Sequence, residues 1–268
     1  MSCKHPPVRN LGVLFDRNLK FDAQITKKCC AGYYYLYNIR KIRKYITLGS
    51  TRCLVHTLVM GRVDYCNSLL YGLATNNINK LQRVQNMAAR LITNTPRFCH
   101  ITPVLCQLHW LPIGVRIKFN VILITSKAIH GLVPYYIQSL IKVKEKSSYN
   151  LRSNDELLLA PPKFKSEKTL GDRAFQVAAP TLWNKLPSAL RMETSLKPFK
   201  AKLKTVLFNP IQSGGGLFEP PLRQNRDNSY TERAMTFKFS DFPKIYLGTF
   251  WYNYHVHVIN HVAMATSF

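Results

Sequence analysis

The sequence is poor in carboxylates. Its 268 residues carry 13 Asp and Glu against 38 Lys and Arg, which gives a formal net charge of +25. So few carboxylates exclude an acidic solvating tail or a metal-buffering protein, and metal-dependent phosphoryl transfer would need several of them to converge. The excess of cations instead favours a polyanionic partner, either nucleic acid or an anionic membrane surface.

Long apolar runs are also missing. No stretch reaches the roughly 18 apolar residues that span a bilayer, and the opening MSCKHPPVRN lacks the apolar segment of a signal peptide. The seven cysteines are an odd number, which indicates reduced thiols, several of them in the core and Cys53 among these. We therefore expect an intracellular protein without a transmembrane segment, in either nucleus or cytoplasm.

The charge is distributed unevenly. Residues 1–208 hold 33 Lys and Arg and 9 Asp and Glu, a net charge of +24, whereas residues 209–268 hold 5 and 4, a net charge of +1. The change coincides with Asn209-Pro210 and with a glycine-rich stretch over 213–216, which is typical of a break between modules. Because 46% of the residues are hydrophobic, we expect at least the first part to fold.

Hydrophobic periodicity predicts a mainly helical fold preceded by one short β-strand over residues 8–15. Asp22 is the expected N-cap of the first helix, whose apolar face would be formed by Ile25, Cys29, Leu36, Ile39, Ile42 and Ile46. Ser50 and either Asn76 or Asn77 are expected to cap the next two helices. Further helices are predicted to begin at Pro112 and Pro134.

The region after residue 143 is predicted to be less regular. Residues 144–170 are polar and Lys-rich, as in a linker, and Pro180 and Pro187 are expected to split residues 172–191 into two short helices. Ser195 is the expected cap of a final amphipathic helix that ends near residue 208. The remaining tail lacks a helical period and is predicted to be irregular.

Eight segments in fixed order carry a family resemblance. They are LGVLFD (11–16), DYCNSLLYG (64–72), LQRVQNMAARLI (81–92), HITPVLCQLHWLP (100–112), LRS (151–153), GDRAF (171–175), AAPTLWNKLP (178–187) and FKAKLKTVLF (199–208). Each is weak alone, but the ordered set is specific. Over about residues 8–208 the chain resembles the C-terminal part of the reverse transcriptase of LINE-type, non-LTR retrotransposons of the jockey/CR1-like group.

This resemblance implies a domain organisation. Residues 1–21 would be the end of the palm, residues 22–143 the helical thumb that grips the primer–template duplex, and residues 144–208 a Lys-rich linker and helical connecting region. Residues 209–268 would be unrelated read-through. The family's catalytic aspartates belong to segments upstream of these, and the chain contains no Asp-Asp pair, so we expect no RNA-directed DNA polymerase activity from this fragment alone.

The function expected from the sequence is sequence-independent binding to the backbone of an RNA–DNA hybrid or duplex. Tyr33, Tyr34, Tyr35 and Tyr45 lie among the cations and could contact sugars or bases. We expect neither cofactor nor metal nor small-molecule substrate. The predicted nucleic-acid-binding residues are Arg40, Lys41, Arg43, Lys44, Gln82, Arg83, Gln85, Asn86, Arg90, Lys197, Lys200, Lys202 and Lys204.

Several alternatives stay open at this point. The chain could be a decayed retrotransposon remnant without a selected function, a basic membrane-surface protein, or part of an enzyme whose palm and fingers come from another chain. Cys99, His100, Cys106 and His109 lie within eleven residues, but their spacing fits no common zinc site. We therefore expect packing or surface roles for these four side chains. Trp110 and Trp183, within apolar motifs, are expected to be core anchors.

Overall fold

The N-terminal segment folds into a β-hairpin. The computed structural model describes residues 6–144, 157–162 and 170–212, and its strands β1 (Val8–Asn10) and β2 (Val13–Phe15) pair antiparallel. Between them, Leu11 and Gly12 have φ values of 46° and 83°, the left-handed conformation that a two-residue hairpin turn requires. The segment predicted as one strand is thus folded back on itself, because Gly12 adopts this conformation at little cost.

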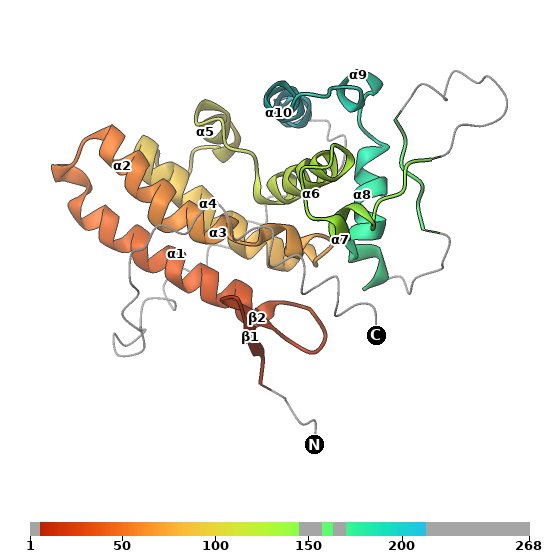
Figure 1. Ribbon diagram of the computed structural model, residues 1–268. Coiled ribbons are helices and arrows are strands. Elements are labelled where there is room, and N and C mark those ends of the chain that lie inside the picture. The colour runs from red at the N-terminus through yellow and green to blue at the C-terminus, as the bar shows by residue number, and fades with distance from the viewer. Residues whose placement is uncertain (1–5, 145–156, 163–169, 213–268) are drawn as a thin grey trace.

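Three helical layers follow the hairpin and form the N-terminal unit (Figure 1). The second layer is an uninterrupted helical run whose middle turn is π-helical, a wider turn that accommodates one extra residue. The elements of the unit are α1 (Asp22–Ile42), η1 (Arg43–Tyr45), α2 (Leu48–Leu54), η2 (Val55–Met60), α3 (Gly61–Asp64), η3 (Asn67–Leu70) and α4 (Thr75–Thr93).

Helices α1 and α4 lie side by side and point the same way. At their N-terminal ends the Asn77 amide donates to the Asp22 carboxylate over 2.7 Å. Midway, Gly32 permits close approach, since a Cβ on it would stand 2.7 Å from Cγ1 of Val84. The core between the layers contains the predicted face of α1, except that Ile42 is 44% exposed. Its buried members include Ile25, Leu36, Ile39, Val59, Met60, Leu81, Val84 and Ile92.

The helix starts differ from the predicted caps by a few residues. Asp22 is the first residue of α1, and the Asp16 carboxylate accepts the backbone N–H groups of Lys20 and Phe21 just before it. Thr47, not Ser50, caps α2 and accepts the Ser50 N–H over 3.2 Å. Helix α4 begins at Thr75 without a side-chain cap, because its N-cap residue is Ala74, whose side chain has no acceptor. Asn77 lies inside the helix and donates to Asp22.

Helix α5 (Ile101–Gln107) was not predicted from the sequence. Its seven residues are too few to show a clear period, and Val104 and Leu105 bury it against Ala89 of α4. The chain then enters α6 (Ile113–Ile129), which Pro112 precedes as predicted to within one residue. The short α7 (Tyr135–Gln138) follows Pro134.

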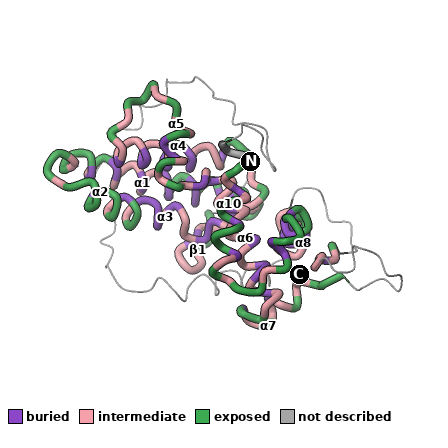
Figure 2. Tube along the Cα trace, turned by 90° about the horizontal axis from the view of Figure 1, so that it is seen from above, coloured by how far each residue is buried: buried purple, intermediate pink, exposed green. Residues whose placement is uncertain are grey.

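The C-terminal unit packs on the second half of α6. It consists of η5 (Gly171–Arg173), α8 (Phe175–Trp183), α9 (Ser188–Arg191) and α10 (Leu196–Gln212). Trp183 is fully buried, stacks on Phe199 with ring centroids 5.9 Å apart, and donates its indole N–H to the Leu157 carbonyl over 2.9 Å. The prediction that Trp183 is a core anchor is confirmed. Figure 2 shows buried residues along α8 and the facing part of α6.

Two predicted breaks are absent from the backbone. Pro180 lies inside α8, where the helix loses one hydrogen bond and continues to Trp183. Likewise α10 continues through Asn209-Pro210 to Gln212, four residues beyond the predicted boundary. Pro187, in contrast, immediately precedes α9 as expected. The predicted irregular tail after residue 212 lies outside the described residues, as does most of the predicted linker.

The mainly helical fold with a short β element at its N-terminal end is confirmed. Within residues 6–144, 157–162 and 170–212, none of the helices combines the length and apolar character needed to cross a membrane. The two units are tied together by Arg173, which donates to the Tyr71 carbonyl over 3.1 Å and to the Leu19 carbonyl over 2.9 Å.

Candidate nucleic-acid interface

A cluster of exposed cations lies where α1 ends. Arg40 and Lys41 occupy the last turn of α1, and Lys44 follows in η1; all three are exposed. We call these three residues the basic end. It forms the tip of the N-terminal unit, where α1 turns into α2 at the left of Figure 1. Within the part of the chain that the structure describes, no carboxylate pairs with any of the three.

Arg43 stands between these cations but serves the fold. Its guanidinium is half-buried and donates to the carbonyls of Ile46 and Leu91, each over 3.3 Å, and of Ile92 over 3.4 Å. These last two carbonyls belong to the final turn of α4, which a cation stabilises. These bonds give Arg43 a role in joining the ends of α1 and α4, and its contact with nucleic acid stays a prediction.

The tyrosines near this end differ in exposure. Tyr33 and Tyr35 pack partly against the core, and Tyr35 accepts a hydrogen bond from Arg62 over 2.9 Å. Tyr34 contacts Tyr35 edge to face. Tyr45 is 76% exposed, with the Lys44 ammonium 4.7 Å from its ring centroid. Of the four tyrosines singled out from the sequence, only Tyr45 therefore presents most of its ring to solvent.

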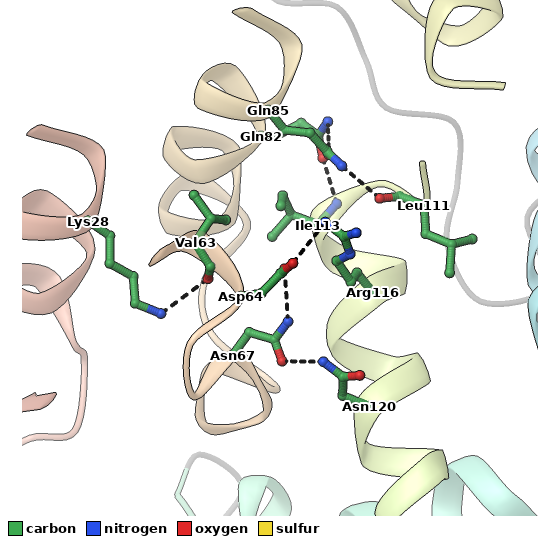
Figure 3. Close-up of polar contacts among 10 residues, drawn as sticks. All are labelled: Lys28, Val63, Asp64, Asn67, Gln82, Gln85, Leu111, Ile113, Arg116 and Asn120. Carbon is green, nitrogen blue, oxygen red and sulfur yellow. Dashed lines mark hydrogen bonds and ion pairs between the residues drawn. The ribbon is translucent and has the colours of Figure 1, made fainter. Parts of the chain in front are cut away.

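The polar face of α4 was predicted to contact a duplex, and for its two glutamines this is a correction. Gln85 is fully buried and donates to the Leu111 carbonyl over 2.9 Å, while Gln82 accepts the Ile113 N–H over 2.8 Å. Figure 3 shows both amides pointing at the start of α6. They satisfy backbone groups that the turn before α6 would otherwise leave unpaired, so neither reaches a ligand.

The other three residues of the polar face of α4, Arg83, Asn86 and Arg90, differ in their exposure and their partners. The Arg83 side chain is exposed, as a contact residue needs to be. Asn86 accepts from the Gln82 amide over 2.8 Å and so extends the buried network. Arg90 donates to the carbonyls of Pro96 and Cys99, the latter over 2.7 Å, and thereby fixes the loop between α4 and α5. We assign Asn86 and Arg90 to the fold.

The lysines of α10 form a second exposed basic surface. Lys197, Lys200, Lys202 and Lys204 are all exposed. Lys202 is paired with Glu193 over 2.5 Å, which neutralises it. Partial burial, with a further contribution from the nearby Lys200, lowers the pKa of Lys127 on α6. This surface belongs to the C-terminal unit and is separate from the basic end: α10 lies at the top of Figure 1 and the basic end at the left.

The carboxylates do not converge. Asp16 accepts backbone N–H groups before α1, Asp22 is bonded to Asn77, and Asp64 lies 3.2 Å from Arg116. Burial raises the pKa of Asp64, and Arg116 opposes this shift. In the described ranges no three His, Cys, Asp or Glu side chains are grouped to hold a metal ion.

Sequence reasoning overlooked three exposed residues near the basic end. Arg52 lies in α2, and Arg97 and Phe98 lie in the loop after α4; Phe98 is 89% exposed. Their signal was faint, since each sits outside a run of charge, although Pro96 marks the loop. Cys53, predicted to lie in the core, is exposed instead, because the inner face of the run passes through Val55 and Val59.

Comparisons of the chain with protein-family models, with curated proteins and with solved structures give no match.

Proposed function

We propose that this chain binds nucleic acid through the sugar–phosphate backbone, that the basic end is its principal contact surface, and that it derives from a reverse transcriptase without polymerase activity of its own. The observation that carries the proposal is the exposed positive charge of the basic end, which no described carboxylate compensates. Arg40, Lys41 and Lys44 are exposed and have no carboxylate partner among the described residues. In a protein that does not bind polyanions, surface charges of both signs are usually interspersed.

The distribution of carboxylates supports this proposal. Asp64 is the only Asp or Glu between Asp22 and Glu145, and Arg116 neutralises it. The helices of the N-terminal unit therefore present cations without compensating anions, and the resulting field would attract a polyanion at long range. The ordered motifs of the sequence support the family origin, in which the helices after the first strand would be a thumb.

The test is a salt titration of the full chain with labelled duplex DNA and RNA–DNA hybrid, followed by fluorescence anisotropy. For the Arg40→Gln, Lys41→Gln, Lys44→Gln variant we expect weaker binding to duplex DNA. The slope of log K against log[salt] should also be shallower by about 3, since each lost phosphate contact changes it by roughly 0.9. A primer-extension assay with Mg²⁺ should show no product.

A matched variant makes this test specific. Lys197→Gln, Lys200→Gln, Lys204→Gln removes the same charge from α10, which lies outside the proposed principal surface. An equal loss from both variants would mean that the chain binds as an undirected polycation, which favours the alternative of a decayed remnant. No change in the first variant would overturn the proposal.

A further inference from the structure

Two exposed aromatic rings follow the ends of α1 and α4. Tyr45 closes η1 directly after α1 and is 76% exposed, and Phe98, in the loop that follows α4, is 89% exposed. Since α1 and α4 run in the same direction (Figure 1), the segments that carry Tyr45 and Phe98 both follow helices that end at the same end of the N-terminal unit. Large apolar side chains exposed to this degree within one region mark a binding surface more often than a random surface position.

Both rings are carried by backbone segments that are held in place. Arg43 binds the carbonyls of Leu91 and Ile92 and so fixes η1 to the last turn of α4. Arg90 binds the carbonyl of Cys99 and so fixes the loop that presents Phe98. A ligand that stacks on these rings would therefore pay little to order the backbone, which favours binding.

Each ring has a cation next to it in the sequence. The Lys44 ammonium lies 4.7 Å from the Tyr45 ring centroid, and the exposed Arg97 directly precedes Phe98. A ring flanked by a cation matches a nucleotide, whose base stacks on the ring while its phosphate meets the charge. The faces of paired bases are hidden inside a duplex, so only an unpaired base can occupy such a ring.

From these observations we infer that the end of the N-terminal unit is a site for single-stranded nucleic acid, with bases stacked on Tyr45 and Phe98 and phosphates bound by Lys44 and Arg97. The inference rests on the proposed function and adds a strand preference to it. The basic end would bind either form of nucleic acid through phosphates, whereas the rings would add affinity for unpaired bases alone.

The experiment compares the full-length protein with its Tyr45→Ala, Phe98→Ala variant on labelled oligothymidylate and on duplex DNA of equal length. We expect oligothymidylate binding to weaken at least about fivefold, because stacking contributes on the order of 1 kcal/mol or more per base. Duplex binding should change less than about twofold, because the bases of a duplex are paired and their faces cannot stack on the rings. Tyr45→Trp should retain the affinity for oligothymidylate, since it keeps a stacking surface.

Tyr135→Ala is the matched control, because Tyr135 is 81% exposed but belongs to α7, away from the basic end. Thermal unfolding of every variant checks that these surface changes leave the fold intact. An equal effect of Tyr45→Ala, Phe98→Ala on both ligands, or no effect on oligothymidylate, overturns the inference while the salt dependence of duplex binding still tests the proposed function. If the basic-end variant binds both ligands like the unmodified protein, the proposed function fails instead.

Discussion

The N-terminal and C-terminal units differ in how many polar side chains they bury. The first encloses the ammonium of Lys28 and the amides of Gln82 and Gln85 beside its apolar core, whereas the second is centred on the stacked rings of Trp183 and Phe199 and buries the Arg191 side chain at its edge. The stability of the first therefore depends more on buried polar groups that must find partners, and that of the second more on dense apolar packing. The comparison teaches that one chain uses two ways of fixing helices, and that the proposed binding surface belongs to the polar one.

The buried polar groups of the N-terminal unit can fix its helices precisely. Hydrogen bonds have direction, so a network such as that of Gln82, Gln85 and the start of α6 fixes the relative positions of helices more narrowly than apolar contact does. At the basic end, Arg43 likewise fixes the end of α1 to the end of α4 through its hydrogen bond to the Leu91 carbonyl. Exposed cations at the ends of helices held in this way keep a constant spacing, which suits the repeating phosphates of the proposed ligand.

The largest expected effect comes from opening the apolar core. Trp183→Ala removes a fully buried indole and should lower the free energy of unfolding by about 3–5 kcal/mol, through lost burial and the cavity left behind. Urea titration followed by circular dichroism measures it. Thr181→Ala, an exposed change on the same helix, should alter stability by less than about 0.5 kcal/mol.

Hydrogen exchange on Trp183→Ala then tests whether the two units are distinct. Amides of α8 and α10 should lose protection first, because their core is the one damaged. Helix α6 links the units through Ile117 in the first core and Ile122 in the second, so α1 and α4 should follow to a smaller extent. Equal loss of protection throughout would show a single cooperative unit and would break the comparison.

The second effect is specific to the polar unit and depends on pH. Lys28 is buried and donates to the carbonyls of Val63 over 3.3 Å and Tyr65 over 2.6 Å. Burial, partly offset by Cys66, Asp64 and Cys29, lowers the pKa of Lys28 from 10.5 to about 8. Between these two values the unfolded chain binds more protons than the folded one, so stability rises with pH across the window.

The measurement is the free energy of unfolding of the unmodified protein minus that of Lys28→Met, from pH 7 to 11. This difference should rise on the order of 3 kcal/mol between pH 8 and 10.5. Burial also raises the pKa values of Cys29 and Cys66, but both proteins contain these thiols and their titration largely cancels. A flat difference would mean that the ammonium is hydrated in the folded protein.

The sequence predicts the apolar contacts of this structure better than its buried polar contacts. Apolar periodicity located α1, α4 and α6 and most of their buried faces, since burial repeats with the helical turn. It assigned Gln82 and Gln85 to the surface, because their partners Leu111 and Ile113 lie in a turn more than twenty residues further along the chain. Periodicity reports the face on which a side chain lies, and a polar face is taken as solvated unless the distant acceptor is known.

The candidate site shows the same limit on a smaller scale. The four cations within residues 40–44 looked alike in the sequence, and three of them are exposed. Arg43 differs only because its helix happens to finish beside the carbonyls of Leu91 and Ile92. Phe98 was overlooked for the opposite reason, since an isolated aromatic residue in a loop has no periodic pattern from which its exposure follows.

The smallest expected effect on stability comes from a change in α4. It decides whether the polar face of this helix supports the fold or contacts a duplex. Gln85→Leu leaves the Leu111 carbonyl without its donor and Gln82 without one of its acceptors, so the free energy of unfolding should fall by about 1–3 kcal/mol. Duplex binding by the folded variant should stay unchanged, because Gln85 is fully buried. Arg83→Gln, two residues away and exposed, should leave stability within about 0.5 kcal/mol. If the Gln85→Leu protein had normal stability but bound duplex DNA more weakly, Gln85 would contact the ligand. The hydrogen bonds of Gln82 and Gln85 would then no longer distinguish the stability of the two units.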